Sequence, residues 1–321
     1  MHPVRLTSAA SAILLLAACA DAPTTSLSVS DPHEARARAR STVSISQAAV
    51  GDPVPFFEAR MAEINDRLAA SGQALRVAQA ELLLGPDAPV EMGTTVYADD
   101  RTKHLPYFWV PGDSRRDADG NNLTYLVDES HSYAYTRASF PGVEYLGDHF
   151  DSTFAPWVAL PCGNLNLVRR PDTGLDPSIV DDGAGMWWLA DIVVAGWMPL
   201  PSGVLGVTYT FTFVDENGDP SDIDGDGRAD TALAEIWYNL GYYWVGDDPG
   251  AVDAIDLQSV GIHENGHALG IGHFGRIFMT NANGKIHFAP QAIMNAAYFE
   301  PMQQLKGTDR ASYCGNFADW P

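Results

Sequence analysis

Three histidines and a glutamate within eleven residues could bind a metal ion and carry out acid–base chemistry. The stretch reads His-Glu-Asn-Gly-His-Ala-Leu-Gly-Ile-Gly-His over residues 263–273. His263 and His267 are four residues apart, so a helix would place both imidazoles on one face. Gly270 permits a sharp turn because glycine tolerates positive φ, and this turn would bring His273 round as a third ligand. Three neutral imidazoles leave one position of Zn²⁺ open, which is typical of a catalytic site.

Glu264 is the expected general base of this site. Three uncharged ligands leave the positive charge of the ion unneutralised, so a water bound to it should ionise near neutral pH. Glu264 follows His263 directly and could accept the proton of that water and pass it to a leaving nitrogen. A chance match of these five positions in a chain of 321 residues has odds of ~10⁻⁵ to 10⁻⁴. We therefore expect Zn²⁺ to be a cofactor.

The residues before the motif predict where its helix begins. Asp256 is a favourable N-cap, and Ile255 and Val260 have the spacing of a hydrophobic staple. The helix that carries His263 should therefore begin just after residue 256.

The motif resembles the metzincin signature His-Glu-x-x-His-x-x-Gly-x-x-His. Met294, in Ala-Ile-Met-Asn at 292–295, resembles the methionine of the turn beneath the metzincin zinc site. The region from about residue 123 to 321 is similar to a bacterial matrixin-like peptidase domain. The resemblance implies a zinc-dependent endopeptidase of class α/β (α+β), with a twisted mixed sheet and an active-site helix. It also implies an edge strand that pairs with extended substrate, for which Val204 to Phe213 is the candidate.

Three features depart from that pattern or extend it. Phe274-Gly275 follows the third histidine and matches none of the best-known metzincin subfamilies. Tyr298 lies four residues after Met294 rather than two, so it stays only a candidate oxyanion helper. Pro161-Cys162-Gly163 faintly resembles the cysteine switch of matrixin pro-peptides, without the rest of that motif.

The N-terminal region, 51–119, should be a small α+β unit. Apolar residues from Phe57 to Leu68 recur at helical spacing, Ser71-Gly72 supplies a stop, and Leu75 to Leu84 predicts a strand. The region could be an inhibitory pro-segment or a packed extension, and we favour the extension. A turn at 117–122 marks the boundary with the peptidase-like domain, 120–321.

The rest of the chain should alternate strands with few helices. β-branched and aromatic runs predict strands at 123–127, 191–197, 204–214 and 232–238. A helix should end near Trp157, and a last helix should include Leu305 and Asp309.

A second metal site is expected in an aspartate-rich loop. Asp222, Asp224, Asp226 and Asp230 take positions 1, 3, 5 and 9, with glycine at position 6. This spacing suits Ca²⁺, although Leu233 replaces the glutamate of an EF-hand at position 12. The alternative is a solvated acidic turn between two strands.

The first residues predict export and a lipid anchor. Arg5 and the short apolar run 12–18 are typical of a signal peptide, and Leu-Ala-Ala-Cys at 16–19 resembles the bacterial lipobox. We expect residues 1–18 to be removed, Cys19 to carry lipid in the cell envelope, and 19–50 to be a flexible tether. In an oxidising compartment, Cys162 and Cys314 could then form a disulfide.

Composition limits the classes of function. The chain is 46% hydrophobic and 19% charged, as in globular proteins, and its formal net charge of −22 disfavours nucleic-acid binding. The expected partners are a protein or peptide substrate and, through the lipid, a membrane. Two alternatives stay open: an inactive binding or adhesion lipoprotein stabilised by zinc and calcium, and a zinc hydrolase acting on a non-peptide amide.

Overall fold

A computed structural model describes the chain in ten segments. These are residues 42–44, 53–86, 88, 95–97, 104–117, 119–129, 146–181, 185–246, 254–280 and 286–321. The expected signal peptide, Cys19 and the expected tether, except for residues 42–44, lie outside them. None of the described helices is long and apolar enough to cross a membrane.

One eight-stranded mixed sheet forms the centre of the fold. Its strands lie in the order β1 (Thr42–Ser44), β2 (Leu75–Leu84), β8 (Val204–Phe213), β9 (Ala229–Asn239), β7 (Ile192–Met198), β5 (Leu123–Val127) and β6 (Leu167–Arg169), with β4 (Tyr107–Trp109) beside β9. Strands β6, β5, β7 and β9 are parallel, whereas β8 runs antiparallel to both β9 and β2. The expected α+β class is confirmed.

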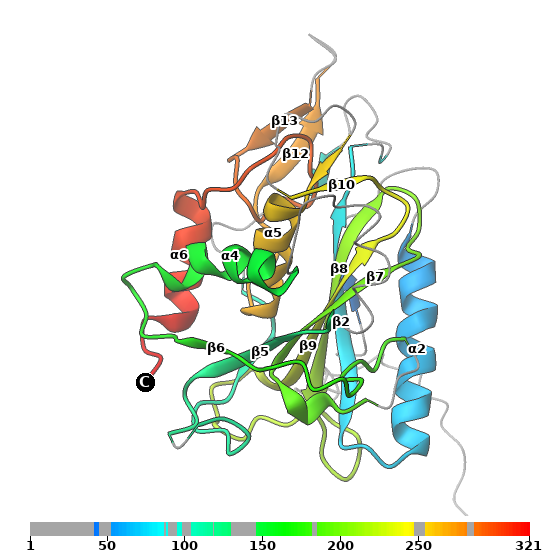
Figure 1. The fold of residues 1–321 in the computed structure, drawn as a ribbon, viewed down its shortest axis with the longest axis vertical. Helices are drawn as coiled ribbons and strands as arrows, with labels where there is room; N and C mark the ends of the chain where they lie inside the picture. The colour runs from blue at the N-terminus through cyan, green and yellow to red at the C-terminus, as the bar shows by residue number, and fades with distance from the viewer. Residues whose placement is uncertain are drawn as a thin grey trace, which may run out of the picture.

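Helices cover both faces of this sheet (Figure 1). On one face lies α2 (Val54–Ala70), and on the other lie α4 (Leu146–Val158), α5 (Leu257–Ala268) and α6 (Gly307–Phe317). Two smaller sheets flank them: β3 (Thr95–Tyr97) with β12 (Arg276–Met279) and β13 (Ile286–Ala289), and β10 (Trp244–Val245) with β11 (Ile255–Asp256). A 3₁₀ turn spans Trp187–Leu189.

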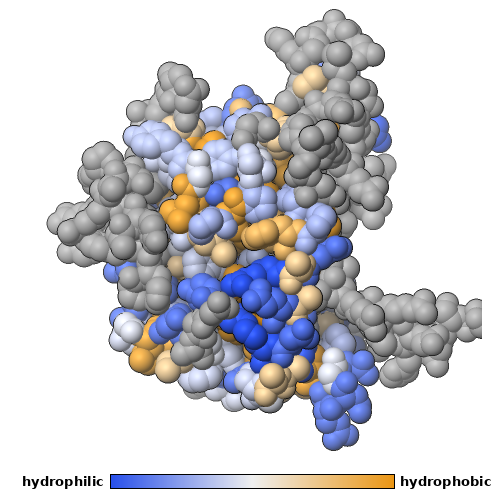
Figure 2. Space-filling model, turned by 90° about the vertical axis from the view of Figure 1, so that its right-hand side faces the viewer, coloured by the Kyte–Doolittle hydropathy of each residue, from blue (hydrophilic) through white to orange (hydrophobic). Residues whose placement is uncertain are grey.

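Two apolar cores separate these layers. The four residues of α2 with helical spacing, Phe57, Met61, Ile64 and Leu68, are all buried and pack on side chains of β2, β7, β8 and β9. The opposite core joins α4, α5 and α6 to the other face of the sheet. The outer side of α2 exposes acidic residues such as Glu58 and Glu63, and the centre of that face is largely hydrophilic (Figure 2).

The sequence located most elements closely. The strand expected at 75–84 and that at 123–127 are β2 and β5, and the helix expected to end near Trp157 is α4, which ends at Val158. Leu305 lies just before the last helix, because Lys306 is the N-cap of α6. Residues 42–44, expected to be flexible tether, pair with β2 as a short parallel strand.

The expectation that Val204–Phe213 is an edge strand is wrong for the described chain. β8 pairs with β9 on one side and with β2 on the other, from Leu75 opposite Phe213 to Leu84 opposite Val204. β2 is buried along almost its whole length, as expected of a strand that has a neighbour on each side. The region 51–119 therefore contributes β2 and β4 to the same sheet as the residues after 120.

Candidate metal centre

Helix α5 begins and ends as its sequence predicts. The carboxylate of Asp256 accepts a hydrogen bond from the backbone N–H of Ser259 at 3.1 Å, and both Ile255 and Val260 are buried beside it. The helix ends at Ala268, after which Gly270 adopts a φ of +76°. The chain turns there toward His273.

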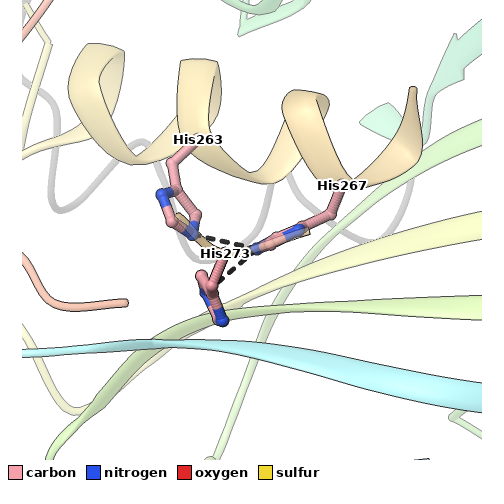
Figure 3. Close-up of side chains that lie close together, drawn as sticks. All are labelled: His263, His267 and His273. Atoms are coloured by element: carbon pink, nitrogen blue, oxygen red, sulfur yellow. Dashed lines mark hydrogen bonds between the residues drawn. The ribbon is translucent and has the colours of Figure 1, made fainter. Parts of the chain in front are cut away.

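The three histidine rings point toward one another (Figure 3). Nε2 of His267 lies 3.0 Å from Nε2 of His263 and 3.2 Å from Nε2 of His273. Two nitrogens of a tetrahedral zinc site, with Zn–N bonds of about 2.0–2.1 Å, are separated by roughly 3.3 Å. The separations therefore suit three ligands of one ion, and each residue is only 1% exposed.

The other ring nitrogens fix the tautomers that metal binding requires. Nδ1 of His263 lies 2.7 Å from the carbonyl oxygen of Ile293, and Nδ1 of His267 lies 2.8 Å from that of Ile271. A carbonyl can only accept, so each Nδ1 carries the proton and each Nε2 presents a lone pair. Lone pairs that face one another at 3 Å repel unless a cation lies between them, and carbonyl-bound Nδ1 atoms are typical of metal-ligating histidines.

Burial keeps these rings neutral. It lowers the pKa of His263 to about 3, with a further contribution from neighbouring His273. Burial, then His273 and His263, likewise hold the pKa of His267 well below its usual value. Neutral imidazole is the form that binds a metal, so the site needs no proton release from these two rings.

Glu264 is fully buried next to the triad. The Thr208 hydroxyl donates to its Oε2 at 2.7 Å, and its Oε1 has no hydrogen-bond partner within the described part of the chain. Burial raises the pKa of Glu264 well above its usual value, and the charge of Glu81 adds to this. A Cβ at Gly206 would lie 2.6 Å from Oε1, so a side chain there would force the carboxylate to move.

A buried polar chain reaches His273 from the N-terminal region. Glu81 of β2 places Oε2 3.1 Å from Nδ1 of His273, and both side chains are almost fully buried. Gln79 donates to the other oxygen of Glu81, and the hydroxyl of Tyr107 donates to Gln79. Strand β2 thus brings a carboxylate to the back of the third histidine.

Met294 lies directly beneath α5. A Cβ at Gly266 would lie 2.4 Å from Sδ of Met294 and 2.9 Å from the Trp157 ring, so the missing side chain lets the methionine pack closely against α5. Asp309 of α6 holds this turn, because its carboxylate accepts from the backbone N–H groups of Ile293 and Met294 at 3.0 and 3.1 Å.

Asn295 links the turn to the residue after the third histidine. Its Oδ1 accepts from the N–H of Ala292 at 2.8 Å, and its Nδ2 donates to the carbonyl of Phe274 at 2.7 Å. Phe274 N–H in turn donates to Met294 O. His273 and Met294 are therefore held by one hydrogen-bonded unit.

A small pocket adjoins His263. It is lined mainly by Leu83 of β2 and by residues 292–302, among them Tyr298. The Tyr298 hydroxyl accepts from the N–H of Asp256 at 3.2 Å. Tyr298, the candidate oxyanion helper, thus serves the start of α5 in this structure.

The remaining predicted site residues form two separate features. Carboxylates of Asp222, Asp224 and Asp226 come together within 4.8 Å of one another, whereas Asp230 turns to the Ser221 hydroxyl and the N–H of Ile223. Cys162 and Cys314 form a disulfide, so Cys162 is not free to act as the thiol latch considered from its sequence context.

Sequence reasoning did not find Glu81, Thr208, Asn295 or the role of Asp309 in the turn. Only β2 offered a signal. Its sequence, Leu-Arg-Val-Ala-Gln-Ala-Glu-Leu-Leu-Leu, places Gln79 and Glu81 two residues apart within an apolar strand, and alternate residues share a face. A buried strand that keeps a carboxylate needs a partner for it.

No family model matches the chain, and no curated protein matches it at a significant level.

Proposed function

We propose that the chain is a zinc-dependent endopeptidase of the metzincin type. The observation that carries this is the convergence of the Nε2 atoms of His263, His267 and His273 beside a buried glutamate. The glycine turn at Gly270 and the methionine beneath α5 support the same assignment. A bound Zn²⁺ would polarise the scissile carbonyl and lower the pKa of water.

Glu264 would then move the proton. Burial raises the pKa of Glu264, but the charge of a bound Zn²⁺ would favour its carboxylate form. That carboxylate would accept the proton of the attacking water and return it to the leaving amine nitrogen. Thr208 orients its carboxylate through the 2.7 Å hydrogen bond. The buried surroundings strengthen each electrostatic contact in the site.

Substitution of the base tests the proposal. Glu264→Gln removes the proton acceptor but none of the three nitrogens, so casein cleavage should fall by about 10²–10⁴-fold while zinc stays stoichiometric. Cleavage is measured before and after limited proteolysis of the chain, with and without chelator. Unchanged cleavage in Glu264→Gln, or a purified chain without stoichiometric metal, contradicts the proposal.

The alternative, an inactive zinc- and calcium-stabilised binding lipoprotein, is favoured by one observation. Strand β8 has both edges paired, so extended substrate cannot pair with β8 in this form of the chain. Zinc-loaded protein that cleaves nothing, with or without proteolysis, would support this alternative.

We further propose a Ca²⁺ site at Asp222, Asp224 and Asp226, and lipid attachment at Cys19 in the envelope of a bacterium. The three clustered carboxylates support the first, and the lipobox-like residues 16–19 support the second. Metabolic labelling with palmitate tests the lipid: label that persists in Cys19→Ala would contradict it.

A further inference from the structure

The amide of Asn316, in α6, caps the end of the helix that carries the first two histidines. Its Nδ2 donates to the carbonyl oxygens of Leu269 and Gly270 at 3.1 and 3.0 Å, and the residue is buried. The last carbonyls of a helix have no donor within the helix. Asn316 therefore supplies donors from another element to the backbone just before the third histidine.

The oxygen of the same amide is fixed by two neighbours. Oδ1 of Asn316 lies 2.6 Å from Nδ1 of His104 and accepts from Nη1 of Arg228 at 3.0 Å. An arginine only donates and a backbone carbonyl only accepts, so a flipped amide would face donor with donor and acceptor with acceptor. Arg228 is held in turn by Asp226 at 2.9 Å and lies over the ring of Phe108.

The turn that Asn316 holds orients two of the three candidate ligands. Gly270 has a φ of +76°, which directs the chain toward His273. The carbonyl oxygen of Ile271, the next residue after Gly270, lies 2.8 Å from Nδ1 of His267. A shift of this turn would therefore move one ligand and weaken the hydrogen bond that orients another.

A disulfide fastens α6 within one helical turn of Asn316. Cys314 is bonded to Cys162, which follows α4, and both cysteines are partly exposed. A Cβ at Gly163 would lie 2.9 Å from the carbonyl oxygen of Phe317, so the backbone beside Cys162 packs closely on the end of α6. The covalent bond thus restricts the part of α6 from which Asn316 reaches the turn.

We propose that Asn316 is a positioning residue for the metal ligands and that the disulfide keeps it in place, so that the metal affinity falls when Cys162–Cys314 is reduced. The proposal rests on the proposed zinc centre and describes its regulation. With a phosphine as reductant, the S–S bond breaks, phosphorus is oxidised to the phosphine oxide with the oxygen of water, and the two protons of that water convert the sulfurs to thiols. An oxidising compartment would keep the centre in its tight-binding form.

The first test compares zinc affinities by competition with a chelator, at a temperature at which circular dichroism shows every variant folded. Asn316→Asp keeps the size of the side chain and the oxygen that faces His104 and Arg228, but it removes the donor that faces the turn. We expect its zinc affinity to fall by about 10-fold or more. Unchanged affinity in Asn316→Asp would overturn the positioning role.

Ser312→Ala is the matched control for Asn316. The hydroxyl of Ser312, also buried in α6, has no hydrogen-bond partner within the described part of the chain. Its removal should leave zinc affinity unchanged, and a loss equal to that of Asn316→Asp would show that any change in α6 weakens the centre, which contradicts a specific role of Asn316.

The second test asks whether the disulfide acts through Asn316. Cys162→Ala with Cys314→Ala removes the bond without leaving thiols that could bind zinc. It should lower the zinc affinity of the wild-type chain by about 10-fold, but that of Asn316→Ala much less, because the contact is already lost there. Equal factors in the two backgrounds would refute the link. Phosphine should lower the affinity of wild type and have no effect on the chain without the two cysteines.

Hydrogen exchange tests the same link without metal and without substitution. The amides of Leu269, Gly270 and Ile271 donate within the end of α5. In the reduced chain their exchange should accelerate by a larger factor than that of the amides of α2, on the opposite face of the sheet. Equal acceleration in both places would indicate a general loosening and count against the proposal.

Metal binding and turnover are measured separately, so the two proposals can fail separately. Variants that lose zinc affinity as expected, in a chain that cleaves no protein, support the positioning role and contradict the endopeptidase function. Zinc-dependent cleavage, with an affinity indifferent to Asn316→Asp and to the disulfide, supports the endopeptidase function and overturns the positioning role.

Discussion

Close approaches at single residues shape the candidate metal centre. Gly206 leaves space for the carboxylate of Glu264, and Gly266 leaves space for Met294. At both positions a methyl group would lie well inside van der Waals contact, so the surrounding atoms would have to move. The two glycines are thus part of the site although they bind nothing.

Substitution of Gly266 should disturb the site through Met294. In Gly266→Ala the new Cβ would meet Sδ of Met294 and the Trp157 ring, so we expect a loss of about 1–3 kcal/mol in the free energy of unfolding and weaker zinc binding. Chemical denaturation and metal titration measure the two effects.

Gly307→Ala is the matched control, because Gly307 lies in α6 with nothing near the added methyl. It should be neutral or slightly stabilising. Equal losses in both variants would show that crowding at Met294 has no particular role.

The candidate ligands could be predicted because their spacing is local. The contact of Glu81 with His273 could not, because it depends on pairing between distant strands. His263, His267, Gly270 and Asp256 act within one helix and its turn, and such relations can be read from adjacent residues. Glu81 reaches His273 across 192 positions only because β2 pairs with β8, which no short pattern encodes.

Strand β9 carries a buried, hydrogen-bonded carboxylate on the side of the sheet that α2 covers. Glu235 is fully buried and accepts hydrogen bonds from the Ser178 hydroxyl, the N–H of Ile179 and Nε1 of Trp237 at 2.5, 2.9 and 2.7 Å. Burial outweighs these bonds and raises the pKa of Glu235 to about 7. The folded state therefore holds this proton more tightly than the unfolded chain, in which glutamate titrates near 4.5.

The raised pKa predicts a specific pH dependence. Because folding favours the protonated form, the stability that Glu235 contributes is full below about pH 4.5, falls as pH rises toward 7, and is constant above it. The difference in unfolding free energy between wild type and Glu235→Gln should therefore decrease by roughly 3 kcal/mol across this window. Urea denaturation from pH 4.5 to 9 measures it, and a difference independent of pH would contradict the assignment.

The disulfide joins two elements that the sheet does not connect. Cys162 follows α4 and Cys314 lies in α6, 152 positions apart. In the chain-entropy view, removing this link by Cys162→Ala with Cys314→Ala should cost about 5 kcal/mol. Thermal unfolding checks this, with reduced wild type as the control; a double variant as stable as oxidised wild type would contradict it.

The type and position of most elements can be predicted from sequence periodicity. Which strands lie next to one another in the sheet cannot. The apolar repeat of α2 and the β-branched runs of β5 and β8 predict type and position. β8 is an interior strand because β2 pairs with it. The sequence of β2 predicts a buried strand but not which strand it pairs with.

At the scale of the whole molecule, negative charge favours cation binding. The formal net charge is −22. The carboxylates of Asp222, Asp224 and Asp226 lie close together and concentrate this negative charge locally. We expect Ca²⁺ at about 100 times its Kd to add about 2.7 kcal/mol to the stability. Melting of zinc-replete protein with and without calcium measures it.

Asp224→Asn should remove most of this calcium response, whereas Asp219→Asn, in the neighbouring exposed turn, should retain it. A melting temperature indifferent to calcium would indicate a solvated acidic turn instead.

Hydrogen bonds from α6 to the candidate metal centre bear on when the centre can form during protein synthesis. Asp309 fastens the turn of Met294, and Asn316 donates to the carbonyls of Leu269 and Gly270 at the end of α5. A nascent chain that has not yet received these two residues cannot hold its histidines in place. If the triad binds Zn²⁺ as proposed, the ion should therefore bind after translation, and a chain exported unfolded would acquire it only after export.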